Sequence, residues 1–450
     1  MAKFLAFKSR SKSSSRTTAA YSRSKYFPER LAVLRARDFR RFYAGYCGSL
    51  LGSAMSSVAI AFALLGDGGT ATGLGLVFTA EIVPMVAFLL FGGALADRLG
   101  RRRVMLTADL VRGAAQAVLA AALAIGHPGL WLFVGAALAV GTGNAFFLPA
   151  LSGFPVQLVP PARLGDANAL LGAAQAAAQV AGPALAGLLI AVTSPALVIT
   201  VDAGSYALSA LALARLRLEP AEPPRRRARP ARSLRGELAD AWTEFNAHPW
   251  LWPQTVQFAL FNLVTWGPYL VLGPVLARQY LGGARAWGTI LACYGGGATL
   301  GGLLALGRRP RRPLLVSTLT TFGFAFPPLA LALRLPLPAV AAAALAAGLG
   351  TAFGDAFDST VNQRLIPAAA LSRVGAFNMA GAYALGPVAF AAAGPVAAAL
   401  GARAVLAFGA AWSVAMTLAV LTVPAIRRQP WPDPRKSPQP ADSAEPDLAR

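Results

Sequence analysis

The chain has 450 residues, of which 56% are hydrophobic and 13% are charged, and its formal net charge is +22. A soluble domain is usually about one quarter charged, so these charges are too few to cover a soluble protein of this length. This composition excludes a soluble enzyme, a disordered scaffold and a small disulfide-linked protein. The apolar blocks are long and uniform, whereas the strands of a membrane β-barrel are short and alternating. The expected class is therefore an all-α membrane protein.

Apolar blocks of about 20 residues, long enough to cross a bilayer as a helix, recur along the whole chain. When they are delimited by Gly, Pro and Arg residues, they predict twelve transmembrane helices. The predicted spans are 42–65, 73–96, 104–126, 130–151, 166–192, 196–214, 250–276, 285–307, 313–333, 337–360, 372–398 and 402–424.

The placement of positive charge predicts the orientation of these spans. Of the 41 Lys and Arg residues, 36 fall in alternate segments, and only four fall in the opposite set of loops. Because cytoplasmic loops carry the excess of Lys and Arg, this bias predicts a multi-pass protein of the cytoplasmic membrane with both termini in the cytoplasm. The net charge then reflects membrane topology, and no nucleic-acid partner is expected.

The polar segments and an internal repeat predict the domains. Gly92-Gly93 and Gly301-Gly302 are 209 residues apart, and Gly141-Thr142 and Gly350-Thr351 share that offset. Repeated halves of this kind are typical of transporters, in which the substrate site lies near the bilayer midplane between the repeats. We therefore expect two pseudo-symmetric six-helix bundles. The predicted domains are a basic cytoplasmic tail (1–41), an N-terminal bundle (42–216), a cytoplasmic linker (217–249), a C-terminal bundle (250–424) and a disordered cytoplasmic tail (425–450).

The segment between spans two and three resembles the signature loop of the major facilitator superfamily, G-x-x-x-D-R-x-G-R-R/K. The matching residues are Gly93, Asp97, Arg98, Gly100, Arg101 and Arg102. The resemblance implies the major facilitator fold, in which the acid of this loop meets the cytoplasmic start of span eleven, here near Ser372. Such a contact would be a reversible latch on the cytoplasmic side. Asp109 and Arg112 lie one helical turn apart in span three and are predicted to form an internal ion pair that supports the latch, with a proton relay as the alternative.

Span five resembles the antiporter motif of the same family, G-x3-G-P-x2-G-G, at Gly182, Pro183 and Gly187, with Ala178 and Ala186 in place of two of its glycines. In the family this motif marks exporters. A close-packed, kinked helix explains these residues equally well. Three further stretches resemble the macrolide-efflux and enterobactin-exporter-like branch of drug:proton antiporters. They are Leu34–Phe42, Val159–Leu171 and Asp202–Tyr206.

Acidic residues inside membrane spans are costly and therefore suggest function. Glu81, near the middle of span two, is a candidate proton carrier, although a neutral, hydrogen-bonded structural role is an alternative. Asp355 and Asp358 in span ten are further candidates for proton coupling, and Asp358 is also compatible with a solvated acid at the membrane edge. In this family spans one, four, seven and ten line the central cavity. The resemblance therefore implies cavity-lining roles for Ser49, Ser53, Asn144, Asn262, Trp266 and Tyr269. The two aromatic side chains suit a bulky amphipathic ligand, and helix packing is the competing explanation.

Together these patterns predict a monomeric secondary transporter that exports small amphipathic molecules, such as drugs, antibiotics or siderophore-like compounds, in exchange for protons. No enzymatic activity, cofactor or metal is expected, because no P-loop or catalytic constellation is present and His127 and His248 have no partner cluster. A solute importer or uniporter is the alternative within transporters. A non-transporting membrane sensor or assembly partner is the alternative of another class.

Overall fold

The computed structural model describes residues 31–216 and 242–431, except for the side chains of residues 31, 32, 89–94, 97, 368, 369, 372, 373 and 376. Most of the predicted tails and linker lie outside the described residues. Within the described residues, twelve helical segments are long and apolar enough to cross a membrane, which confirms the all-α class and the predicted number of spans.

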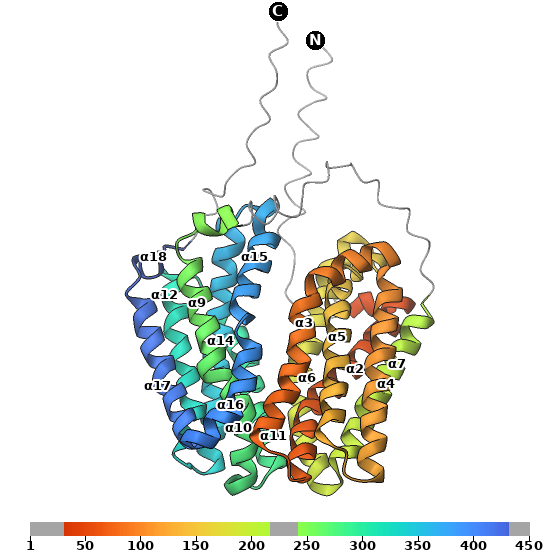
Figure 1. Cartoon of the computed structure of the whole chain (residues 1–450). Helices are drawn as coiled ribbons and strands as arrows, with labels where there is room; N and C mark the ends of the chain where they lie inside the picture. Colours follow the sequence, from red (N-terminus) through yellow and green to blue (C-terminus); the bar gives the residue numbers. More distant parts are fainter. Residues whose placement is uncertain (1–30, 217–241, 432–450) are drawn as a thin grey trace, which may run out of the picture.

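The N-terminal half consists of six long, unbroken helices, whose arrangement Figure 1 shows. They are α2 (Arg37–Gly66), α3 (Ala71–Leu99), α4 (Arg101–Ile125), α5 (Leu130–Ser152), α6 (Leu164–Val192) and α7 (Pro195–Ala214), with short 3₁₀ turns η1 (Leu31–Arg35), η2 (Pro155–Gln157) and η3 (Pro161–Arg163). Pro84, Pro149 and Pro183 lie inside these helices. Proline is tolerated there because neighbouring helices can satisfy the freed backbone groups.

In the C-terminal half, the spans predicted as continuous at 250–276, 313–333 and 372–398 are each interrupted. The seventh comprises α9 (Leu251–Phe261), the π-helix η4 (Asn262–Trp266), α10 (Gly267–Leu276) and the π-helix η5 (Ala277–Leu281). The ninth comprises α12 (Pro313–Thr320), the 3₁₀ turn η6 (Thr321–Ala325) and α13 (Phe326–Ala332), and the eleventh comprises α15 (Ala368–Tyr383) and α16 (Gly386–Leu400). The remaining elements are α11 (Ala284–Ala305), α14 (Leu337–Leu365), α17 (Ala402–Leu421) and α18 (Pro424–Arg427). In the ninth and eleventh spans the interruption coincides with prolines, which lack a backbone N–H and so leave a carbonyl without its helical partner.

The two halves repeat the same packing plan. In the N-terminal half, α2 packs against α6 and α7, α3 against α5, and α4 against α7. In the C-terminal half, the seventh span packs against the eleventh and twelfth, α11 against α14, and the ninth span against α17. Close approach depends on small residues in both halves: a Cβ added at Gly141 of α5 would collide with the carbonyl oxygen of Glu81, and one at Gly348 of α14 with that of Tyr294. The internal sequence repeat therefore corresponds to two six-helix bundles.

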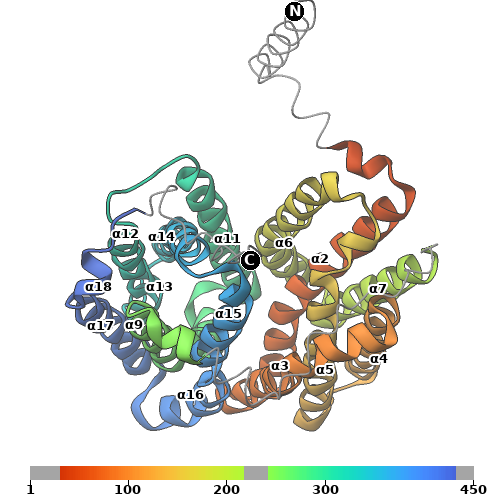
Figure 2. The same ribbon diagram turned by 90° about the horizontal axis from the view of Figure 1, so that it is seen from above.

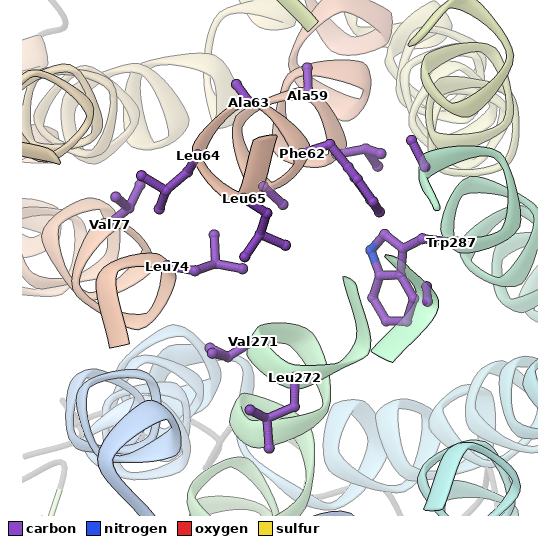
Figure 3. Packing of buried hydrophobic residues seen from close by; sticks show 14 of the residues in the cluster. Ala59, Phe62, Ala63, Leu64, Leu65, Leu74, Val77, Val271, Leu272 and Trp287 are labelled. Atoms are coloured by element: carbon purple, nitrogen blue, oxygen red, sulfur yellow. The ribbon is translucent and has the colours of Figure 1, made fainter. Parts of the chain in front are cut away.

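The bundles are packed together at one end of the molecule, near α10 and α11, and diverge toward the other, where α15 and α18 lie (Figures 1 and 2). We call these the closed end and the open end. At the closed end the largest hydrophobic cluster spans both bundles, with Phe62 and Leu65 of α2, Leu272 of α10 and Trp287 of α11 (Figure 3). Where such a contact removes apolar surface from water, it is stabilised by roughly 25 cal/mol per Å². Where it replaces contact with lipid, close packing and dispersion provide the stabilisation.

Candidate functional site

The closed end is sealed by two helix pairs that connect the bundles. In the first pair, the hydroxyl of Thr79 on α3 donates to the carbonyl oxygen of Pro387 on α16 at 3.2 Å, and the rings of Phe78 and Phe390 are 5.6 Å apart. In the second, Gly187 of α6 faces Gly288 of α11: a Cβ at Gly187 would lie 3.3 Å from the Cα of Gly288. Dispersion holds both pairs together, and the first pair also has the hydrogen bond from Thr79. Among the described residues, no ion pair joins the helices of either pair. Contacts of this type can separate without leaving a buried charge.

The predicted antiporter-like residues lie in this second pair. A Cβ at Gly182 would meet Ala54 of α2, and the carbonyl oxygen of Pro183 approaches Gly288 too closely for any side chain there. Span five therefore contacts both its own bundle and the opposite one through small residues. This geometry accounts for the packing role of Gly182, Pro183 and Gly187, and their link to export stays a prediction.

A buried polar cluster occupies the middle of the N-terminal bundle. Asp109 is fully buried and is ion-paired with Arg112, as the sequence analysis expected of these two residues. The Arg112 guanidinium also donates to Oδ1 of Asn144 at 2.7 Å and lies 4.2 Å from the ring centre of Phe147. Removing either ionic partner would leave the other charge buried without compensation.

The cluster continues toward α7 through Gln116, which the sequence analysis did not single out. Its side-chain amide donates to Oγ of Ser56 at 2.7 Å and to Oδ2 of Asp202 at 2.8 Å, while Ser53 and Tyr206 share a hydroxyl hydrogen bond of 2.8 Å. Gln116 follows Asp109 and Arg112 at helical spacing, i+7 and i+4, and this spacing was the available signal.

Glu81 of α3 borders the same cluster but is not bonded to it. It lines a small cavity of about 50 Å³ together with Ser53, Gln116, Asn144, Asp202 and Tyr206. Its carboxyl group makes no hydrogen bond or ion pair with any described residue. A cavity of this size holds a few water molecules, since one water needs about 10–15 Å³ measured this way. Water in this cavity can therefore connect Glu81 to the polar cluster.

The C-terminal bundle contains a larger cavity of about 230 Å³, which we call the C-bundle cavity. Asp355 and Asp358 of α14 both line it, but their surroundings differ. Asp358 accepts hydrogen bonds from Gln254 at 2.7 Å and from Asn362 at 3.1 Å. The Asp355 side chain is exposed and has no hydrogen-bond or ionic partner among the described residues. Of these two acids, Asp355 is therefore the one available to a ligand.

The six residues expected to line a central cavity occupy three different environments. Ser49 of α2 is buried, whereas Ser53 and Asn144 belong to the polar cluster of the N-terminal bundle. Asn262 is buried and donates from its amide to the carbonyl oxygens of Phe258 and Ala382. The two aromatic residues stack on each other: the rings of Trp266 and Tyr269 are 5.7 Å apart. Asn262 and Tyr269 are thus placed in the interior of the C-terminal bundle.

The signature segment is more helical than its description as a loop suggests. α3 extends to Leu99, and the single residue Gly100, with φ of +89°, connects it to α4. Only glycine adopts this backbone conformation readily, which explains the residue at that position. Arg102 donates to the carbonyl oxygens of Leu213 and Ala214 at 2.8 and 2.6 Å, so it caps the last turn of α7.

The remaining residues of the signature segment lie at the open end. Arg98 is exposed, and Arg101 lies beside Gly153, the residue that follows α5. The side chain of Asp97 and the residues Gly93 and Ser372 fall outside the side chains that the structure describes. The latch between Asp97 and the start of span eleven therefore stays a prediction. Among the described residues, no group of three or more His, Cys, Asp or Glu side chains is placed to hold a metal ion.

Comparison with known proteins agrees with this architecture. Residues 42–380 match the family model described as Major Facilitator Superfamily. The chain is 30% identical over 292 residues to the multidrug efflux pump Tap of Mycolicibacterium fortuitum, covering 62% of this chain and 70% of that protein. It is 26% identical over 282 residues to macrolide efflux protein A of Streptococcus pyogenes, covering 62% and 69%.

Solved structures show the same fold at low sequence identity. The nucleoside transporter NupG superposes with a TM-score of 0.66 at 12% identity, covering 86% of this chain and 98% of that one. A bacterial homologue of the human lysosomal transporter Spinster gives a TM-score of 0.59 at 15% identity, covering 89% and 96%. With twelve spans, two repeated bundles and a family match over most of its length, the chain belongs to the major facilitator superfamily, a family of membrane transporters, and is related to its drug-efflux branch.

Proposed function

We propose that this transporter exports small amphipathic molecules from the cytoplasm in exchange for protons, with its open end facing the cytoplasm. The orientation is supported by the distribution of Lys and Arg, since the segments at the open end carry most of these residues. The relationship to the multidrug and macrolide efflux proteins supports export of a drug-like substrate. A second conformation would then complete the transport cycle. In it the bundles separate at the closed end and meet at the open end.

The observation that carries proton exchange is the position of Glu81. It has no partner among the described residues, and it lies on α3, whose first half forms the seal with α16. An unpaired carboxylate inside a membrane span is strongly disfavoured, so an enclosed Glu81 carries a proton. When the seal opens and water reaches α3, the group can exchange that proton with the medium. Protonation and bundle movement are therefore coupled through one residue.

The test uses everted membrane vesicles in which a fluorescent drug accumulates by transport. Collapsing the pH gradient with nigericin should stop accumulation in the wild-type protein, and Glu81→Gln should abolish gradient-driven accumulation while Glu81→Asp retains part of it. Accumulation that survives collapse of both the pH gradient and the membrane potential would refute proton exchange. If Glu81→Gln retains full gradient-driven transport, Asp355 becomes the candidate for proton coupling. If the gradient drives drug out of the vesicles, the protein is an importer.

A further inference from the structure

The C-bundle cavity arises at a point where the two halves of the protein differ. In the C-terminal bundle the seventh span changes to a π-helix after Phe261, and the ninth span changes to a 3₁₀ turn after Thr320. Phe261 and Thr321 both line the cavity. The corresponding spans α2 and α4 of the N-terminal bundle are continuous, and the polar cavity of that bundle is only about 50 Å³. Irregular helices at membrane depth are tolerated where they line a cavity, and π-bulges often mark functional sites.

The irregular backbone is stabilised by specific contacts. Asn262 lies at the first position of the π-helix, and its side-chain amide donates hydrogen bonds to the carbonyl oxygens of Phe258 and Ala382. Pro327 and Pro328 follow the 3₁₀ turn and lack the N–H groups that would have continued the α-helix. Since both breaks are held by their own residues, the cavity is a built feature of the bundle.

No described Lys or Arg balances the charge in the cavity. Neither residue type is among the described residues that line it, and each carboxylate oxygen of Asp358 already accepts a hydrogen bond, one from Gln254 and one from Asn362. Asp355 has no partner among the described residues and is exposed, although it lies ten residues before the end of α14, well inside the span. At 1.5 Å per residue that is about 15 Å from the end of the helix. A carboxyl group kept open at this depth has a position suited to a cation.

The other walls combine aromatic rings with polar groups that can still bond. The rings of Phe258 and Tyr383 are 6.0 Å apart at one wall, and aromatic faces attract cations. Thr321 and Thr417, which also line the cavity, share a hydrogen bond of 2.9 Å between their hydroxyl groups. The indole N–H of Trp412 is buried at the cavity without an acceptor among the described residues. A ligand that fits these groups has a cationic amine, an apolar or aromatic body, and a hydrogen-bond acceptor.

We infer that the C-bundle cavity binds the ammonium end of an amphipathic substrate, with Asp355 as its counter-ion. At about 230 Å³ the cavity is smaller than the roughly 300–1,000 Å³ of pockets that enclose whole drug-sized ligands. Only the amine-bearing end is therefore enclosed, and the rest of the molecule extends toward the space between the bundles. This inference rests on the proposed export of small amphipathic molecules and gives it a substrate class and an off-axis binding site.

Binding is measured on the purified full-length protein in nanodiscs, without any gradient, by fluorescence titration. The probe is monodansylcadaverine, which has a terminal ammonium group, and its neutral control is N-acetyl-monodansylcadaverine. The wild-type protein should bind the amine more tightly than the acetylated form. Asp355→Asn should weaken amine binding by about tenfold or more and leave binding of the neutral form unchanged. The control Asp166→Asn, at the first turn of α6 and outside the cavity, should change neither.

A second variant tests the location, because Asp355 could also contact a ligand held between the bundles. Met416→Trp adds bulk inside the cavity from α17 and should block the amine, with folding checked by size-exclusion chromatography and thermal unfolding. A wild-type protein without preference for the amine would overturn the inference, and so would amine binding unaffected by Asp355→Asn or by Met416→Trp in folded protein. Because no gradient is present, these failures are distinct from a failure of proton-driven export.

Discussion

The glycine contact between α6 and α11 gives a direct test of the two-conformation model. A Cβ placed at Gly187 would lie 2.7 Å from the carbonyl oxygen of Ala284 and 3.1 Å from the Cα of Arg285. Both are backbone atoms, so no side-chain rotation can relieve the contact. To restore an ordinary separation of 3.4 Å, α11 must move away by about 0.7 Å. Overpacking of this kind raises the free energy by about 1–3 kcal/mol.

This strain exists only while the closed end is sealed. Gly187→Ala should therefore favour the conformation in which the closed end is separated and the open end is sealed. A bias of about 1–3 kcal/mol changes the ratio of two conformations by about 5- to 150-fold. The matched control is Gly172→Ala on the same helix, where an added Cβ meets nothing within 4 Å. Both substitutions raise helix propensity by about the same amount. The difference between their effects on the ratio of the two conformations therefore reports on the contact alone.

The assay is a distance measurement by double electron–electron resonance. Spin labels are attached at Asn168 of α6 and Gln363 of α14, two exposed positions at the open end, after Cys47 and Cys293 have been replaced by alanine. Gly187→Ala should increase the population with the shorter distance, and Gly172→Ala should reproduce the parent distribution. An unchanged distribution in Gly187→Ala, with the protein folded, would show that this contact does not control the equilibrium.

Three further predictions concern the signature segment and the buried ion pair. Asp97→Asn should leave the amount of folded protein unchanged but sharply reduce export, measured as drug accumulation in everted vesicles; undiminished export would contradict the latch. Arg102→Ala removes two hydrogen bonds to the end of α7 and should lower the thermal unfolding temperature, whereas Arg103→Ala, whose side chain is exposed, should not; equal effects would contradict the capping role. Arg112→Met leaves Asp109 buried without its ionic partner and should reduce the free energy of unfolding by about 3–5 kcal/mol, with Arg112→Met/Asp109→Leu recovering part of the loss. If the double variant does not unfold at a higher temperature than Arg112→Met, the unpaired charge of Asp109 is not the cause of the lost stability.

The sequence alone determined the number of spans and the internal repeat of this protein. Both follow from the thickness of the bilayer, because a helix must supply about 20 apolar residues to cross it, and the repeat is visible as glycines at a constant offset. The pairing of Asp109 with Arg112 was also predictable, since both residues are on one helix and their spacing fixes their distance.

Tertiary structure decided the environments of the polar residues. Asn262 and Tyr269 are on a predicted lining helix, but the π-helix at Asn262–Trp266 and the packing of neighbouring helices place both in the interior of the bundle. Asp355 and Asp358 look alike in sequence, and the hydrogen bond that Gln254 donates to Asp358 from α9 distinguishes them. Hydropathy and spacing describe one helix at a time, whereas a cavity and an unpaired acid depend on which groups several helices bring together.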